Sequence, residues 1–362
     1  MKMMDGKGNN SMSKKVCFVL YNTSAQASGG YKMVYMYANL LAERGHKVSI
    51  MFMNTESLSS FPTFIRIAGV KYLTKKRPTW YELDRSIEKL SWYPDGDRKQ
   101  YDFDCVIATE LKTADFVDSH FEHSKKAYFI QDYENWGVSE DVVQATYRLD
   151  MKKIVISDWL KEIVDQYSGC PSVVIKNPID LEIYKVKTPP AQRNPYTVGM
   201  LYHANEYKGC HYAVEALKIV KKRIPELKVY AFGTADWPDD MPGWFAYTRN
   251  ASQEDTVEIY NKCLVWTCAT IEEGFGLTGL EAMACGCALA STDYRGIREY
   301  AVNGYNSLLS PVKDCEALAE SIIELLEKPE RRMSVSGSGL ETVKEFGINK
   351  AIRRFEETII ES

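Results

Sequence analysis

The sequence predicts an α/β protein with two Rossmann-like domains, each built on a doubly wound parallel sheet. Three observations support this fold class. The chain has 362 residues, which favours two domains over one. Short apolar runs alternate along it with helical patterns, as in βαβ units. Glycines stand where a strand would turn into a helix, at Gly29-Gly30 and again at Gly274 and Gly276.

A βαβ unit opens the first domain. Val16–Leu20 and Val48–Phe52 are apolar runs that predict buried parallel strands. A helix is expected between them, from about Tyr31 to Arg44, with Gly45 as its C-cap. Gly29-Gly30 precedes the helix but lacks the further spaced glycine and later acid of the dinucleotide fingerprint. A tight turn and a close approach to phosphate therefore both remain open for this loop.

Residues 53–100 carry a weaker pattern. Ile65–Ile67 and Val70–Leu73 fit short strand fragments, and the segment from Trp80 to Trp92 is amphipathic. The aromatic residues at 92–93 fit an acceptor-binding surface, although simple packing is the better explanation.

The remaining strands of the first domain are expected at 103–109, 126–130, 153–156 and 172–176. Gln131 and Asp132 follow the second of these strands directly. Ligands of doubly wound sheets bind at the carboxyl ends of the strands, so both side chains are candidate site residues. Local capping by Asp132 is the alternative. Ser157 is predicted to cap the helix that begins after it.

A proline-containing segment, Leu181–Tyr196, predicts the linker to the second domain. In that domain, strands are expected at 197–201, 227–233, 244–247, 263–269, 288–291 and 307–309, and helices at 211–223, 254–262, from 277, and at 315–327. A Gly/Ser-rich break at 336–339 precedes a last helix at about 349–361. Its apolar stripe is expected to pack on the first domain, with packing on the second domain as the alternative. The predicted parts are a disordered extension (1–13), the two domains (14–185 and 186–345) and the terminal helix (346–362).

Composition excludes several classes of function. The hydrophobic content is 45%, the charged content 26% and the net charge −4, which argues against a nucleic-acid partner. No apolar run reaches the roughly 20 residues needed to span a bilayer, and the polar first 15 residues do not resemble a secretion signal. The nine cysteines have no regular spacing, and Cys285 and Cys287 stand too close for a zinc pair. Free thiols in the cytoplasm are therefore expected, without a structural metal.

Charge is uneven between the two halves, with a net +1 over residues 1–185 and −5 over the rest. This allows weak contact between the first domain and an anionic membrane surface or a lipid-linked acceptor, although scatter in composition is the simpler explanation.

The stretch from Glu272 to Gly286 combines a glycine-rich turn with a helix start near Leu277. Such a turn directs backbone N–H groups and the positive helix end at an anion, most often phosphate. Glu281 lies one turn inside the helix, where a carboxylate can accept two hydroxyl hydrogen bonds from a ribose. An ordinary helix start, with Glu273 near the dipole and Glu281 in solvent, is the alternative.

This stretch, continued through Glu281–Gly286 to Glu299, resembles the glutamate signature of the retaining glycosyltransferases of family 4, which have the GT-B fold. The resemblance implies that two domains face each other across a cleft. Glu273 would then contact the donor sugar, Glu281 the nucleotide ribose, and the backbone of Gly276, Leu277 and Thr278 the phosphate. Gly29-Gly30 would lie against the donor diphosphate.

The same resemblance implies further site residues. Asp132, with Gln131, would lie near the transferred sugar, and the Gln131–Glu134 segment is similar to that of rhamnosyltransferase-like relatives. The family's phosphate clamp pairs an Arg with a Lys; only Lys208 remains here, because Met200 stands at the Arg position. His203 or Arg249 could supply the missing contact. The implied catalytic set is Glu273, Asp132 and Lys208.

The expected function is thus a metal-independent retaining hexosyltransferase that uses a nucleotide-sugar donor, needs no cofactor, and modifies a glycan or lipid-linked acceptor in polysaccharide synthesis. The expected location is the cytoplasm or the inner membrane face. Two alternatives stay open: a sugar-nucleotide epimerase or phosphorylase on the same fold, and a nucleotide-sugar-binding protein with weak catalysis.

Overall fold

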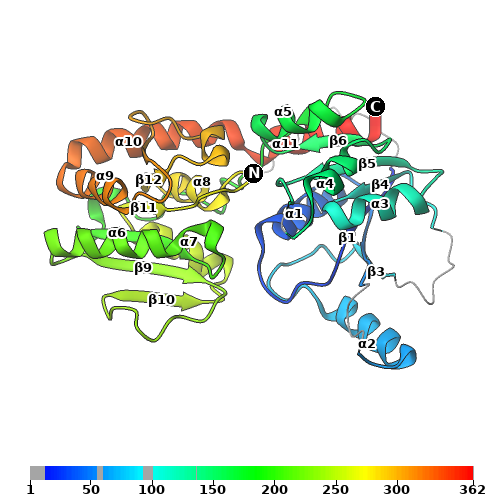
Figure 1. The fold of residues 1–362 in the computed structure, drawn as a ribbon, viewed down its shortest axis with the longest axis horizontal. Helices are drawn as coiled ribbons and strands as arrows, with labels where there is room; N and C mark the ends of the chain where they lie inside the picture. The colour runs from blue at the N-terminus through cyan, green and yellow to red at the C-terminus, as the bar shows by residue number, and fades with distance from the viewer. Residues whose placement is uncertain (1–12, 55–59, 93–100, 136, 362) are drawn as a thin grey trace, which may run out of the picture.

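The computed structural model describes residues 13–54, 60–92, 101–135 and 137–361. Most of the expected N-terminal extension and the aromatic residue Tyr93 lie outside these ranges. The chain forms two parallel sheets that lie side by side, each flanked by helices (Figure 1). The fold class predicted from the sequence is confirmed by this topology and by the comparisons given below.

The first sheet has seven strands in the order β3-β2-β1-β4-β5-β6-β7, all parallel. Its strands are β1 (Lys15–Leu20), β2 (Lys47–Phe52), β3 (Glu88–Ser91), β4 (Cys105–Ala108), β5 (Lys125–Ile130), β6 (Lys152–Val155) and β7 (Val173–Val174). Its helices are α1 (Gly29–Glu43), α2 (Thr63–Lys76), α3 (Leu111–His120), α4 (Glu140–Tyr147) and α5 (Asp158–Tyr167).

The second sheet has six parallel strands in the order β10-β9-β8-β11-β12-β13. They are β8 (Thr197–Tyr202), β9 (Lys228–Gly233), β10 (Phe245–Arg249), β11 (Val265–Cys268), β12 (Ala288–Thr292) and β13 (Ser307–Ser310). The helices of this half are α6 (Cys210–Arg223), α7 (Gln253–Lys262), α8 (Leu277–Ala284), α9 (Cys315–Glu327) and α10 (Pro329–Thr342). In both sheets the order reverses beside the first strand of the sheet, and that point places a ligand crevice at the carboxyl ends of the strands.

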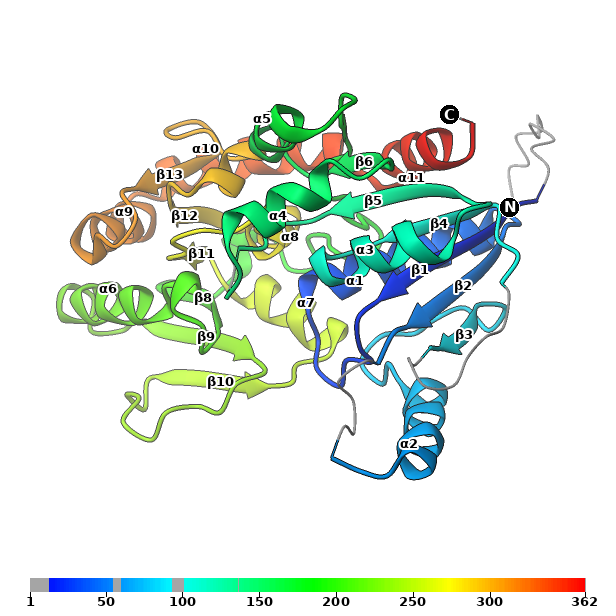
Figure 2. The same ribbon diagram turned by 45° about the vertical axis from the view of Figure 1, so that its right-hand side comes forward.

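The strand fragments expected at 65–67 and 70–73 are wrong, because both lie inside helix α2. Short apolar runs do not distinguish strand from helix, and here an uninterrupted stretch of 14 residues allows α2 to form. Figures 1 and 2 both show α2 standing out from the first domain.

The Gly/Ser-rich break expected at 336–339 is also wrong, since these residues lie within α10. The small side chains allow α10 to approach α8 closely. A Cβ on Gly339 would lie 3.4 Å from Met283 Cγ, and Ser336 Oγ donates a hydrogen bond of 2.8 Å to the Gly286 carbonyl. The glycines and serines at 336–339 are therefore explained by close packing between α10 and α8, and not by a break in the chain.

The last helix, α11 (Ile348–Glu356), continues as a π-helical turn over Glu357–Glu361 and packs on α1 of the first domain. Phe355 is fully buried and stacks on Tyr37, with ring centroids 4.2 Å apart. Glu356 accepts a hydrogen bond from Arg44 at 2.5 Å. The exact domain bounds expected from the sequence remain a prediction.

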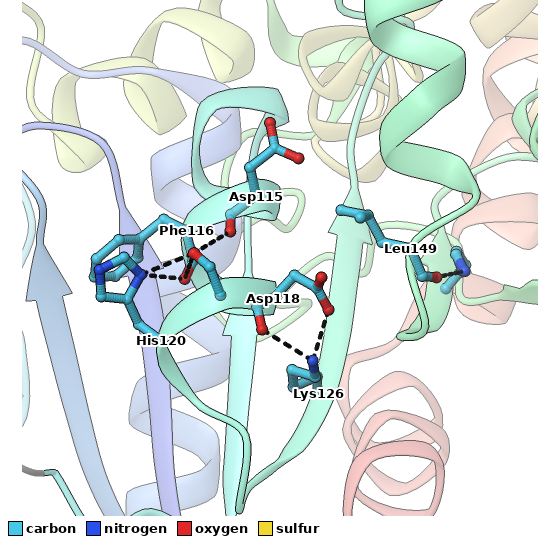
Figure 3. A network of polar contacts seen from close by, with 8 residues as sticks. Asp115, Phe116, Asp118, His120, Lys126 and Leu149 are labelled. Atoms are coloured by element: carbon cyan, nitrogen blue, oxygen red, sulfur yellow. Dashed lines mark hydrogen bonds and ion pairs between the residues drawn. The ribbon is translucent and has the colours of Figure 1, made fainter.

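The helices of the first domain are tied to its sheet by polar contacts away from the cleft (Figure 3). Lys126 of β5 forms a 2.6 Å ion pair with Asp118 of α3. His120 is within 3.1 Å of the Phe116 carbonyl in the same helix. Lys153 is buried and donates to the Leu149 carbonyl, and burial lowers its pKa. The Lys126–Asp118 pair lies at the amino end of β5, opposite the strand end that carries Gln131 and Asp132.

Candidate active site

Loops from both domains meet at the carboxyl ends of the two sheets. A Cβ on Gly29 would lie 3.4 Å from Leu277 Cδ1 of the second domain. A Cβ on Gly30 would lie 3.4 Å from the Gln131 side chain, and one on Gly274 would lie 2.2 Å from the Gln131 carbonyl oxygen. Gly274 is thus needed for the close approach of its loop to the Gln131 backbone, whereas Gly29 and Gly30 lie at ordinary contact distance from their neighbours. The structure brings together Gly29, Gly30, Gln131 and Leu277, and their role in donor binding stays a prediction.

Helix α8 begins at this meeting point. Its N-cap, Gly276, has a φ of +88°, and a Cβ there would lie 1.9 Å from the Tyr294 hydroxyl. No side chain caps the helix, so the first-turn N–H groups, including those of Leu277 and Thr278, keep their capacity to bind an anion. The Tyr300 hydroxyl donates to the Gly276 carbonyl at 2.5 Å and holds the turn in place.

Lys208 and Glu273 form an ion pair of 2.5 Å at the mouth of this turn. Burial alone would lower the pKa of Lys208, but the Glu273 carboxylate outweighs burial, and the pKa lies above its ordinary value. Lys208 follows β8 on a short 3₁₀ turn, Glu206–Lys208, whereas Glu273 precedes α8. The two residues, 65 positions apart, are brought into contact because β8 and β11 are neighbours.

Asp132 faces this pair from the first domain. Its pKa is raised to about 7, mainly by burial and in part by Glu273, while the Tyr133 N–H and Lys208 oppose the rise. Next to it, burial raises the pKa of Glu134 to about 8, although the Leu111 N–H, at 2.5 Å, lowers it in part. The sequence analysis named the Gln131–Glu134 segment but did not predict that the pKa of Glu134 would be raised.

Glu281 is 6% exposed, so the solvated alternative does not hold. One of its oxygens accepts a hydrogen bond from Lys32 of α1, in the other domain, and the other accepts from the Tyr260 hydroxyl at 2.9 Å. Lys32 also donates to the Tyr184 hydroxyl at 2.8 Å. Sequence reasoning missed all three partners. The sequence did set Lys32 apart, because it is the one charged residue of α1 before Glu43 and lies close to the Gly29-Gly30 turn.

His203 and Arg249 have different positions. His203 is half-buried, and burial and Lys208 lower its pKa while Glu273 opposes them, so it lies near the Lys208–Glu273 pair. Arg249 is at the end of the edge strand β10, where it pairs with Asp236 and donates to the Thr234 carbonyl at 3.3 Å. The contacts of the described residues do not bring Arg249 to the other candidates. Thr278 Oγ1 is 3.9 Å from Cys268 Sγ.

Glu299 ties the second domain to α5 of the first. Its carboxylate accepts a hydrogen bond of 2.8 Å from the Asp158 N–H and forms a 2.8 Å ion pair with Lys176. Ser157 was expected to cap α5 but does not, because its hydroxyl is buried without a partner among the described residues. The Glu299 carboxylate from the other domain takes this role. Trp159 Nε1 also donates to the Gly274 carbonyl at 3.1 Å.

Within the described ranges, no three His, Cys, Asp or Glu side chains gather as ligands for a metal ion. All nine cysteines are unpaired thiols. Met200 is 1% exposed in the core of the second domain and contributes no charge to the cleft. None of the helices in the described part of the chain is both long and apolar enough to cross a bilayer.

Comparison with known proteins adds the family. Residues 185–340 match the family model described as glycosyl transferases group 1. An uncharacterized glycosyltransferase of Methanocaldococcus jannaschii is 25% identical over 205 residues, which cover 56% of this chain and 57% of that protein. The O-antigen biosynthesis protein RfbC of Myxococcus xanthus is 26% identical over 57% of this chain. The matched region spans only 17% of RfbC.

Two solved structures share the fold over nearly the whole chain. Sucrose-phosphate synthase from Thermosynechococcus elongatus has a TM-score of 0.74 at 14% identity, covering 95% of this chain and 98% of that one. HepE of Anabaena, in complex with UDP-glucose, has a TM-score of 0.73 at 15% identity, covering 95% and 99%. Residues 185–340 therefore match the glycosyl transferases group 1 family, within a chain that has a two-sheet GT-B fold.

Proposed function

We propose that this protein is a retaining glycosyltransferase that moves a hexose from a nucleotide-sugar donor to a glycan or lipid-linked acceptor. The observation that carries the proposal is the convergence of Lys208, Glu273 and the uncapped start of α8 on the Gly29-Gly30 loop of the other domain. A diphosphate between these groups would meet backbone N–H donors and a cation from two sides. Such groups stabilise the charge that develops on the leaving nucleoside diphosphate.

In this proposal, Glu273 and Asp132 orient the donor sugar, and Glu281 accepts hydrogen bonds from the ribose. Asp132 is well suited to the sugar, because a carboxyl group with a pKa near 7 can both donate and accept hydrogen bonds near neutral pH. Lys208 and the helix N-terminus supply the charge that a metal ion supplies in other transferases, so we expect no divalent-metal requirement.

Cell-surface polysaccharide synthesis is the process we propose, since RfbC is named for O-antigen biosynthesis. The Gln131–Glu134 segment is similar to that of rhamnosyltransferase-like relatives, so a rhamnosyl donor is the first sugar donor to test. Nine free thiols support a reducing compartment, the cytoplasm.

The test has two stages. Thermal-shift screening against UDP-, GDP-, ADP- and dTDP-sugars identifies the donor, because a ligand at 100 times its Kd stabilises the fold by about 2.7 kcal/mol. Transfer of radiolabelled sugar to extracted glycan and lipid acceptors is then measured with and without EDTA. Transfer in EDTA is expected. Donor binding without transfer would favour a binding protein, and abolition by EDTA would contradict the metal-independent scheme.

Contact with the inner membrane face is supported by α2. Phe61, Phe64 and Tyr72 are 50%, 74% and 63% exposed, beside the exposed residues Lys71, Lys75 and Lys76. The sequence has no Asp or Glu between Glu56 and Glu82. Apolar side chains among lysines favour an anionic lipid surface. Co-sedimentation with anionic vesicles should be lost in the Phe64→Ser/Tyr72→Ser variant; absence of wild-type binding would refute the contact.

A further inference from the structure

Lys32 of the first domain forms an ion pair with Glu281 of the second. Its side chain is 22% exposed, and that of Glu281 is 8% exposed. The ammonium lies between the Glu281 carboxylate and the Tyr184 hydroxyl, 4.8 Å from the centre of the Tyr184 ring. The pair lines a cavity between the domains, together with Tyr184, Gln253, Leu277 and Leu280.

Both Glu281 oxygens already have a donor in this arrangement, Lys32 on one and Tyr260 on the other. The proposed function gives Glu281 the ribose diol as its ligand. A ribose entering the cavity would therefore meet a carboxylate whose cleft-side oxygen is held by an ammonium group. Each Glu281 oxygen keeps a second lone pair, but the Lys32 ammonium lines the same cavity and occupies the side of the carboxylate on which a ribose would enter, so the hydroxyls compete with Lys32 for that side.

The cleft otherwise has little positive charge to offer a diphosphate. Lys208 is the first cation of the site, but part of its charge is offset by Glu273 at 2.5 Å, and Met200, buried in the core, adds none. Lys32 follows Gly29 by three residues on the first turn of α1, and Gly29 contacts Leu277 at the start of α8. The flexible four-carbon stem of a lysine can thus swing from Glu281 toward an anion held between the two helix starts.

We infer that Lys32 is the second cation of the donor site: Glu281 holds it when the site is empty, and the ribose hydroxyls displace it onto the diphosphate. The inference rests on the proposed function. The exchange leaves no buried charge without a hydrogen-bonding partner, because Glu281 would accept from the ribose hydroxyls and Lys32 would pair with a phosphate. A nucleoside without phosphates would displace Lys32 from Glu281 without giving the Lys32 ammonium a new anionic partner. Lys32 therefore selects for the diphosphate and links its binding to contact between the domains.

The experiment compares calorimetric affinities for UDP and for uridine, or for the diphosphate and nucleoside of whichever base the donor screen identifies. Lys32→Met should bind the diphosphate at least tenfold more weakly, and the nucleoside as well as or better than the wild type. Lys32→Arg should stay close to the wild type. Lys176→Met is the matched control, since it removes another ion pair between the domains, with Glu299, without touching Glu281.

A merely structural role for Lys32 would weaken both ligands by the same factor, and an unchanged ratio of the two affinities would overturn the inference. If Lys32→Met does not fold, Lys32→Gln gives the same comparison, because its amide can still donate to Glu281. A wild-type protein that binds none of the nucleoside diphosphates would instead refute the proposed function, and the inference with it.

Discussion

Asp132 shows how a single side chain in the cleft depends on its surroundings. Burial and the neighbouring Glu273 carboxylate raise its pKa to about 7, although the Tyr133 N–H and Lys208 oppose the rise. Its pKa in the unfolded chain is about 3.9. Between these values the folded protein binds a proton that the unfolded chain has lost, so this group makes the fold less stable as pH rises from about 4 to 7.

Asp132→Asn should remove that pH dependence. We expect the variant to gain stability over the wild type as pH rises from about 4 to 7, by up to about 4 kcal/mol. Urea unfolding at pH 5 and pH 8.5 covers the upper two pH units of this range and should show about 2.7 kcal/mol of the change. The variant also loses the Asp132 charge that helps to raise the pKa of Glu134, and this change acts in the same direction. An equal difference in unfolding free energy at the two pH values would show that Asp132 has an ordinary pKa.

Glu281→Ala should weaken binding of the nucleoside diphosphate by about 1.5–3 kcal/mol, since a charged acceptor of the ribose hydroxyls is lost. Calorimetry measures the loss. Glu258→Ala is the control, because Glu258 lies on the exposed side of α7 and pairs only loosely with Lys262, at 3.8 Å. Unchanged affinity in Glu281→Ala would remove this residue from the ribose role.

Among the elements, α11 depends most on a distant part of the chain. It follows the second domain in sequence, yet the Phe355 ring lies among Phe18, Tyr37 and Phe129 of the first. The stability of the first domain should therefore depend on the last residues of the chain.

Phe355→Ala should destabilise the first domain by about 3–5 kcal/mol, because it empties a fully buried aromatic site. Urea unfolding followed by amide hydrogen exchange in β1 and β5 measures this. Lys350→Ala, on the exposed face of the same helix, should change little. If protection were lost only in the second domain, α11 would not be part of the first-domain core.

At the scale of the whole molecule, two segments cross between the domains next to each other. The Ile179 N–H donates to the Phe346 carbonyl at 2.7 Å, and Ile179 and Gly347 form an isolated parallel bridge. The linker expected at 181–196 is less free than its prolines suggest, since Arg193 is buried and donates to the Cys263 carbonyl at 2.7 Å. Rotation of the domains should accordingly centre on Ile179 and Gly347.

Donor binding should close the cleft about this point, because the diphosphate contacts Gly29-Gly30 on one side and α8 on the other. Small-angle scattering should show a smaller radius of gyration at saturating nucleotide than in the free protein. Lys176→Met, which loosens the Glu299 contact, should enlarge the change. An identical radius with and without ligand would favour a rigid cleft.

The sequence alone determined the features that arise from local pattern. Apolar runs predicted most strands of both sheets, and the glycine turn before Leu277 predicted the start of α8. Gly276 marked a position that only glycine can occupy, because it has a positive φ and a Cβ there would overlap the Tyr294 hydroxyl. These predictions succeed because strand periodicity and glycine conformation depend on neighbouring residues.

Only the tertiary structure decided which distant residues meet. Lys32 and Glu281 are 249 positions apart, and nothing local links them. Glu299 caps α5 in place of Ser157, and close packing against Met283 keeps a glycine-containing segment helical in α10. Arg249 lies at a sheet edge because of strand order, which its own neighbourhood in the sequence does not reveal. Contacts between domains depend on how two sheets pack, so the charges of the cleft pair in ways that short-range patterns cannot specify.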